Sequence, residues 1–156
     1  MADQPSAKDR PDRIYQLVYL SRSRMSAQPE DVAEELRDIL AVARTFNARA
    51  GITGALLFSG ERFAQVLEGP RQAVLTLMDH IRCDRRHHDV VILQEGYVAV
   101  RNFGSWSMAF MDEQSCRLIR LSSSGDFRGM PVAGRGRVIL DMMRYLLSGQ
   151  EEETGP

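Results

Sequence analysis

The chain has 156 residues, of which 44% are hydrophobic and 26% are charged, and its formal net charge is −1. This composition is ordinary for a soluble globular protein, and the length suits one domain with one or two added elements. A charge so close to zero argues against a general nucleic-acid or membrane-surface binder, which would carry a basic excess.

The cysteines and the N-terminus predict a cytoplasmic protein. Cys83 and Cys116 are the two cysteines and belong to no CxxC pair, which favours a reducing setting. No apolar run approaches the length of a transmembrane helix. Residues 1–12 lack the apolar core of a signal peptide and are predicted to be a disordered polar arm.

The first strand is predicted over residues 14–20, where alternation places Tyr15 and Tyr19 on one face. A polar loop follows, and Pro29 suits the first turn of a helix. Apolar residues at helical spacing extend this helix over residues 30–46.

Two strands are then predicted over residues 52–59 and 62–69. Gly60–Glu61 separates them, and glycine at the first position of a two-residue link is typical of a type II′ hairpin. A second helix is predicted from Pro70 to about Cys83.

The charged stretch 84–89 is predicted to be a turn, and residues 90–98 and 106–110 to be two further strands. The first six elements then follow the order strand–helix–strand–strand–helix–strand. This is the ferredoxin-like split βαβ order. The predicted fold class is therefore α+β, ferredoxin-like βαββαβ with an extra strand and both helices on one sheet face.

The chain after residue 112 is predicted to be an extension over 113–150 with a frayed acidic end over 151–156. Apolar spacing predicts a helix near residues 137–148, packed on the other sheet face under the strand that carries Trp106 and Met108. Its apolar stripe is predicted to contain Val138, Met142, Tyr145 and Leu146, widened by Ile139 and Met143.

A glutamine falls among core residues in the stretch FAQVLEG, residues 63–69. Alternation places Gln65 on the same face as Phe63 and Leu67, and a buried amide left unpaired costs about 1–3 kcal/mol. The first and third strands are neighbours in this fold, so Tyr19 can donate to the Gln65 carbonyl. The amide still has two N–H groups to place, and a bound polar heterocycle would accept them.

Four stretches of the chain together resemble the BLUF family, the flavin-binding sensors of blue light. They are IYQLVYLS, FNARAGITGALLFSGERFAQVLEG, DRRHH and RNFGSWSM, and the resemblance covers residues 13–112 without a gap. It implies non-covalently bound FAD, with the flavin ring between the two helices and its edge toward the sheet. It also implies a photoreceptor rather than an enzyme.

The resemblance implies a role for each matching residue. Tyr19 is the phenol and Gln65 the amide that bridges it to the flavin. Asn47 binds the polar edge of the flavin ring. Trp106 and Met108 are the pair that competes for the place beside Gln65. All five roles come from the resemblance and not from spacing.

The same resemblance extends to the charged turn. Asp84, Arg86 and His87 match positions that hold the flavin rim or its phosphate-bearing tail. One departure is Phe46, since many relatives carry a polar or imidazole residue just before the asparagine that binds flavin. An apolar ring at this position walls or stacks on the flavin instead.

The function that the resemblance implies is light-driven electron and proton transfer from Tyr19 through Gln65, which rearranges the hydrogen bonds of the flavin. The signal then passes on by protein–protein interaction. Because few residues follow residue 112, no fused output enzyme is expected. The implied partners are a second copy of the chain and a separate effector, with no nucleic acid, membrane or metal.

Plainer explanations exist for each of these side chains. Tyr19 can donate to a backbone carbonyl as a core tyrosine, and Gln65 can reach water at a sheet edge. Asn47 can cap the first helix. Residues 84–88 can form a solvated turn, and their adjacent histidines make a poor metal site. The apolar side chains of 106–110 can simply be core.

Two other functions occur on the same fold. An RNA-binding module needs aromatic residues in a basic motif on the open sheet face, and the third strand has none. A hydrolase of the acylphosphatase type needs a phosphate-binding loop after the first strand, and SRSRMS contains no glycine.

Overall fold

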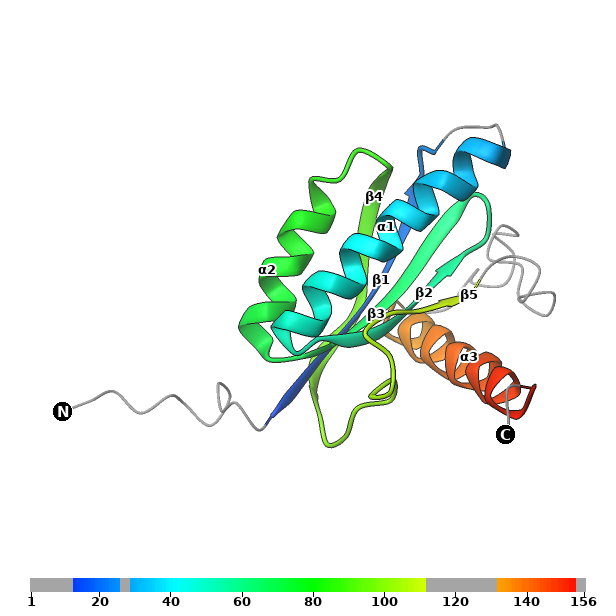
Figure 1. Ribbon diagram of the computed structural model, residues 1–156. Helices are drawn as coiled ribbons and strands as arrows, with labels where there is room; N and C mark the ends of the chain where they lie inside the picture. Colours follow the sequence, from blue (N-terminus) through cyan, green and yellow to red (C-terminus); the bar gives the residue numbers. More distant parts are fainter. Residues whose placement is uncertain (1–12, 26–28, 112–131, 154–156) are drawn as a thin grey trace.

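The computed structural model describes residues 13–25, 29–111 and 132–153 (Figure 1). The elements are β1 (Ile14–Ser23), α1 (Pro29–Ala50), β2 (Thr53–Phe58), β3 (Arg62–Gly69), α2 (Arg71–Arg82), β4 (His87–Val98), β5 (Ala109–Met111) and α3 (Val132–Glu153). The predicted disordered arm over 1–12 lies outside the described residues, as do residues 113–131 of the predicted extension and 154–156 of the predicted frayed end.

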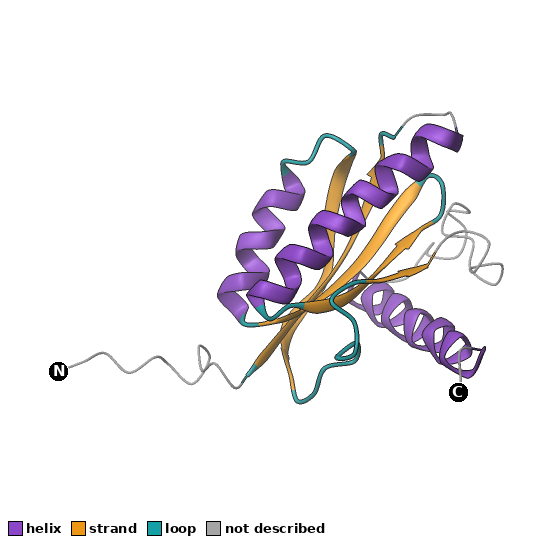
Figure 2. Cartoon of the chain, viewed as in Figure 1, coloured by secondary structure: helices purple, strands orange, loops and turns teal. Residues whose placement is uncertain are grey.

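The five strands form one sheet in the order β4-β1-β3-β2-β5. Neighbouring strands are antiparallel except β2 and β5, which are parallel. Helices α1 and α2 cover one face of the sheet and α3 lies against the other (Figure 2). The predicted ferredoxin-like α+β fold with an added strand is therefore confirmed.

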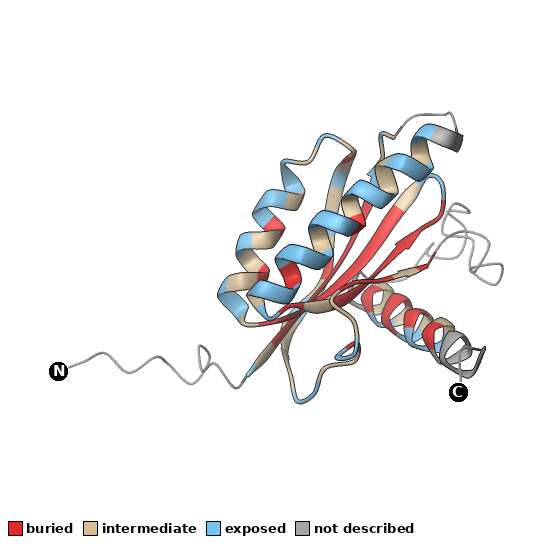
Figure 3. Ribbon diagram, in the orientation of Figure 1, coloured by how far each residue is buried: buried red, intermediate tan, exposed pale blue. Residues whose placement is uncertain are grey.

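Alternation along the central strands divides the core into two layers. Tyr15, Leu17 and Tyr19 of β1 pack with α1 and α2, whereas Val18 and Leu20 pack on the α3 side. The central strands and the sheet-facing stripe of α3 are the most buried parts of the chain (Figure 3). The faces predicted for the first strand are confirmed.

Several strand boundaries differ from the prediction. β1 extends through Ser23 and β4 begins at His87, because Ser23 pairs with His87 and Arg22 with His88. Of the strand predicted over 106–110, only the part from Ala109 onward is strand. These boundaries depend on pairing partners distant in sequence, which local alternation does not reveal.

The C-terminal helix is longer at both ends than the predicted 137–148. It packs on β4 and β1, and its buried side chains share one hydrophobic cluster with Ala109 and Met111 of β5, against which Trp106 also packs. A Cβ at Gly136 would lie 2.7 Å from Gln94 Cβ, so glycine permits the close approach of α3 to β4 there.

The buried stripe of α3 follows from the close approach at Gly136. Its buried side chains are Ile139, Leu140, Met143 and Leu147. The prediction that Tyr145 belongs to the apolar stripe is wrong, because its side chain is 67% exposed. No described helix is both long enough and apolar enough to cross a membrane.

Residues 99–108 join β4 to β5, and Glu68 anchors the first half of the stretch 101–108, called the connection below. The Glu68 side chain is fully buried at the end of β3. Its carboxylate accepts the backbone N–H of Asn102 at 2.7 Å and of Phe103 at 2.8 Å. Gln16 Nε2 on β1 donates to it at 3.1 Å. A buried carboxylate with this many donors fixes the connection to the sheet.

We expect Glu68→Gln to destabilise the protein. An amide NH₂ in place of one carboxylate oxygen faces backbone N–H groups, which leaves at least one buried donor unpaired at a cost of about 1–3 kcal/mol. Urea unfolding followed by circular dichroism measures the loss. The exposed Glu61→Gln is the matched control and should unfold like the parent. Equal unfolding midpoints for both variants would contradict an anchoring role for Glu68.

Candidate functional site

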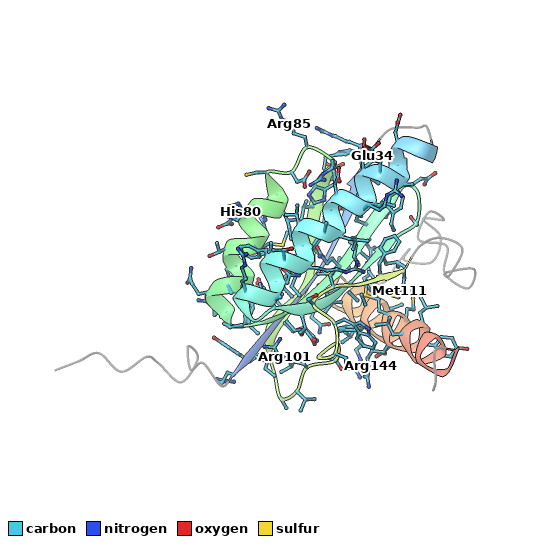
Figure 4. All side chains as sticks on the ribbon, viewed as in Figure 1. Glu34, His80, Arg85, Arg101, Met111 and Arg144 are labelled. Carbon is cyan, nitrogen blue, oxygen red and sulfur yellow. The ribbon has the colours of Figure 1, made fainter. Side chains whose placement is uncertain are left out.

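A cavity of ≈ 310 Å³ lies between α1, α2 and the sheet. Most of its wall is apolar, and the polar groups are few, as is typical of small-molecule sites. One lining side chain, His80 on α2, is labelled in Figure 4. The lining residues are Tyr19, Ile39, Val42, Ala43, Phe46, Asn47, Leu56, Phe63, Gln65, Leu77, His80, Ile81, Asp84, Arg86 and His87.

Tyr19 and Gln65 face each other directly across β1 and β3 on the floor of the cavity. Tyr19 Oη donates to Gln65 Oε1 at 2.5 Å, and both side chains are buried. Gln65 Nε2 donates to Met108 Sδ at 3.4 Å, a weak acceptor. The structure therefore brings together the phenol, the amide and the thioether named from the sequence.

Burial keeps the Tyr19 phenol protonated. Loss of solvation, with a smaller contribution from the nearby Asp84 carboxylate, raises the pKa of Tyr19 far above its ordinary value. A neutral phenol is the hydrogen-bond donor that the Gln65 carbonyl needs. The orientation of the amide follows, because Oε1 accepts from Tyr19 and Nε2 is left as a donor.

Asn47 has one end bonded and one end free. It is fully buried in the last turn of α1, and its Nδ2 donates to Ser107 O at 2.9 Å. Its Oδ1 is buried without a hydrogen-bond partner among the described residues. Gly51, with φ +74°, takes the left-handed position after the helix, so Asn47 is not the left-handed cap. The free acceptor at the cavity suits an N–H of a ligand.

Asp84 and Arg86 form an ion pair at the edge of the cavity. Arg86 Nη2 lies 2.5 Å from Asp84 Oδ2, and Arg86 Nε lies 2.9 Å from Oδ1. These bonds hold the pKa of Asp84 below its ordinary value, with burial opposing them. The turn that the sequence predicted is thus an ordered charged rim rather than a freely solvated loop.

His87 reaches the cavity because of a β-bulge. β4 has one extra residue between the partners of Leu20 and Arg22, and Asp89 in this bulge has φ +53°. An extra residue reverses the alternation of the strand, which turns His87 toward the helices.

Both ring nitrogens of His87 are bonded within the protein. Nε2 lies 2.5 Å from Ile81 O and Nδ1 lies 2.8 Å from Ser21 Oγ. A carbonyl can only accept, so Nε2 carries a proton, and in a neutral ring Nδ1 accepts from Ser21 Oγ. His87 therefore has only its ring to offer a ligand.

Trp106 and Met108 are separated by the sheet. Met108 belongs to the cluster under α1 and α2, whereas Trp106 packs against the cluster on the α3 side. Met108, not Trp106, is the residue beside Gln65.

Sequence reasoning missed three polar residues around the site. Ser21 bonds His87, Arg44 Nε donates to Met108 O at 3.1 Å, and Glu68 holds the connection. The sequence did carry one indication for Glu68. It pairs with Gln16 across β1 and β3, so two polar side chains share one sheet face there. The other two contacts depend on tertiary structure. No group of three His, Cys, Asp or Glu residues suited to a metal occurs in the part of the chain that the structure describes.

One protein-family model matches residues 14–109, and its description is BLUF, sensors of blue-light using FAD. Among curated proteins, the chain is 32% identical over 96 residues to the blue light- and temperature-regulated antirepressor BluF of Escherichia coli (strain K12). It is 36% identical over 97 residues to the photoactivated adenylate cyclase subunit alpha of Euglena gracilis. Each match covers 62% of this chain but only 23% and 9% of those relatives.

Solved structures agree with these matches over more of the chain. The dark-state structure of the BLUF protein BlrB has a TM-score of 0.70 and 29% identity, and the match covers 89% of this chain and 99% of that one. BlsA in its photo-activated state has a TM-score of 0.62 and 28% identity, covering 87% and 93%.

Proposed function

The chain belongs to the BLUF family of sensors of blue light using FAD, and we propose that Tyr19 and Gln65 carry out its light-driven switch. The protein is thus a photoreceptor that binds FAD, not an enzyme. The single observation that supports the switch is the buried Tyr19–Gln65 hydrogen bond, whose amide donor has only a thioether for a partner.

The residues around the cavity fit the flavin ring of FAD. The ring is planar and largely apolar, and its polar edge carries an N–H between carbonyls. Asn47 Oδ1 offers an unpaired acceptor for that N–H, and Gln65 Nε2 offers a donor. Ala43, Leu77 and the other apolar side chains of α1 and α2 would hold the ring faces.

The charged rim would hold the rest of the cofactor. Arg86 carries guanidinium N–H groups that suit phosphate oxygens, and its pairing with Asp84 keeps it oriented at the cavity edge. His87 would contact the ring through its face or edge, because its nitrogens are already bonded. Phe46, on the last turns of α1, would wall one side.

FAD supplies the colour and, when excited by blue light, an electron acceptor. Loss of an electron would make the Tyr19 phenol strongly acidic, so its proton would pass along the hydrogen bond from Oη to Gln65 Oε1 while the same amide releases one Nε2 proton toward the bound ring and stays neutral. When the electron returns to Tyr19, Oη would regain a proton and the phenol would be restored. The Gln65 amide is left rotated or tautomerised, so that its donor and acceptor positions have changed. The stored signal is this altered hydrogen bonding.

The signal would leave through residue 108. A changed Gln65 amide changes the partner of Met108 Sδ, and the same connection carries Trp106 to the α3 side of the sheet. Contact with a separate effector, or with a second copy of the chain, would then respond. The E. coli relative is named an antirepressor, which supports a protein effector. The effector, the homo-oligomer and the cytoplasmic location remain predictions.

Tyr19→Phe should keep FAD bound and lose the light-induced red shift of flavin absorption, because the ring is retained and the transferable proton is removed. Difference spectra before and after blue light measure the shift. Tyr15→Phe, on the same strand and face, is the control and should photocycle. A normal red shift in Tyr19→Phe would rule out Tyr19 as the donor.

Gln65→Leu should also bind FAD without a red shift, because leucine has a similar volume but neither donor nor acceptor. The same light-minus-dark spectra test it. The control is Gln72→Leu at an exposed position of α2, which should photocycle like the parent. Gln16 is unsuitable because its side chain bonds Glu68. A native difference spectrum from Gln65→Leu would exclude the amide as the switch.

Ala43→Trp should abolish FAD binding, because an indole on this lining residue fills much of the ≈ 310 Å³ cavity. The flavin content of the purified protein and its circular dichroism are measured together. Ala41→Trp places the same side chain at an exposed position of α1 and should retain FAD. Full flavin content in a folded Ala43→Trp protein would mean that FAD binds elsewhere.

A further inference from the structure

The three successive backbone carbonyls of residues 106–108 each accept a hydrogen bond, although these residues belong to no strand. Gly54 N–H donates to Trp106 O at 3.2 Å, and Asn47 Nδ2 donates to Ser107 O at 2.9 Å. Arg44 Nε donates to Met108 O at 3.1 Å. Side chains of α1 thus replace the ladder that a longer β5 would have supplied.

Arg44 and Asn47 act from one face of α1. They are three positions apart in a helix, so their side chains are neighbours. Asn47 is buried and lines the cavity, whereas Arg44 lies outside it and contributes to no part of the proposed photochemistry. Arg44 is exposed, and its Nε bonds a main-chain carbonyl rather than a carboxylate.

The carbonyl that Arg44 holds belongs to the residue that contacts Gln65. Met108 Sδ lies 3.4 Å from Gln65 Nε2, and the Met108 side chain is 2% exposed. Methionine has several rotatable bonds and adapts to more than one position. A fixed main chain is therefore needed to keep its sulfur at one place beside the amide.

We infer that Arg44 is a positioning residue that holds the main chain of Met108 and thereby keeps Met108 Sδ against the Gln65 amide in the dark. This inference rests on the proposed function, since it concerns the environment of the Gln65 switch. Without Arg44, Asn47 would be the remaining hydrogen-bond donor from α1 to the connection among the described residues, and the place beside Gln65 would be less well defined.

The contact itself is tested by fluorescence of Trp106, the single tryptophan of the chain, two residues from Met108. Emission and acrylamide quenching are measured on the full chain in the dark, with and without FAD. Arg44→Met should raise the quenching of Trp106, while Arg44→Lys, which keeps a donor, should restore much of the parent value. Arg37→Met, another exposed position on α1, should match the parent. Parent-like quenching in Arg44→Met would overturn the inference.

The effect on the switch is tested by the rate of dark recovery. Arg44→Met should change this rate by about two- to tenfold, the range that one net hydrogen bond represents. A double-mutant cycle with Met108→Leu tests whether Arg44 acts through the Met108 sulfur. If it does, Arg44→Met has no further effect on the recovery rate in the Met108→Leu background. An equal effect in both backgrounds would overturn the inference.

The two measurements also separate this inference from the proposed function. If the parent protein shows no red shift, the proposed function fails and so does the link to Gln65. Trp106 quenching would still decide whether Arg44 holds the connection, because that reading needs neither light nor FAD.

Discussion

The hydrogen bond between Tyr19 and Gln65 depends on the register of the two central strands. The two residues are direct partners in the antiparallel pairing of β1 and β3. A slip of one residue would turn either side chain to the opposite face of the sheet and break the pair. The hairpin pairing of Phe58 with Phe63 fixes one end of β3, and the bond between Gln16 and Glu68 fixes the other. The cavity exists because this register is held at both ends.

Two sets of buried polar groups, one on each face of the sheet, differ in how completely they are hydrogen-bonded. On the α3 side, Glu68 is surrounded by donors and its acceptors are fully used, so it serves the fold. On the cavity side, Asn47 Oδ1 has no partner and the Gln65 amide has a weak one. Incomplete hydrogen bonding costs stability in the protein alone. A ligand that completes it would recover that stability, which supports the proposal that the cofactor binds on the cavity side.

The sequence predicted those features that local patterns determine. Alternation identified the inward faces of β1 and β3, and the order of elements made these strands neighbours, so the Tyr19–Gln65 pair followed. The start of β4 at His87 did not follow, because it depends on pairing with Ser23. The buried stripe of α3 differs from the predicted one, and Tyr145 lies outside it, because the approach of Gly136 to Gln94 sets the rotation of the helix. Both are contacts between segments far apart in the chain.

Residues 106–108 show why the strand predicted over 106–110 begins only at Ala109. Trp106, Met108 and Phe110 alternate as in a strand, yet Met108 joins the cavity side whereas Trp106 joins the α3 side. A regular strand paired with β2 would be held by a cooperative ladder of backbone bonds. Individual bonds from Arg44, Asn47 and Gly54 hold this segment instead, each from a different donor group. In the proposed switch, a change at Gln65 would move Met108 without unpairing the sheet, and the same segment reaches the side where α3 packs.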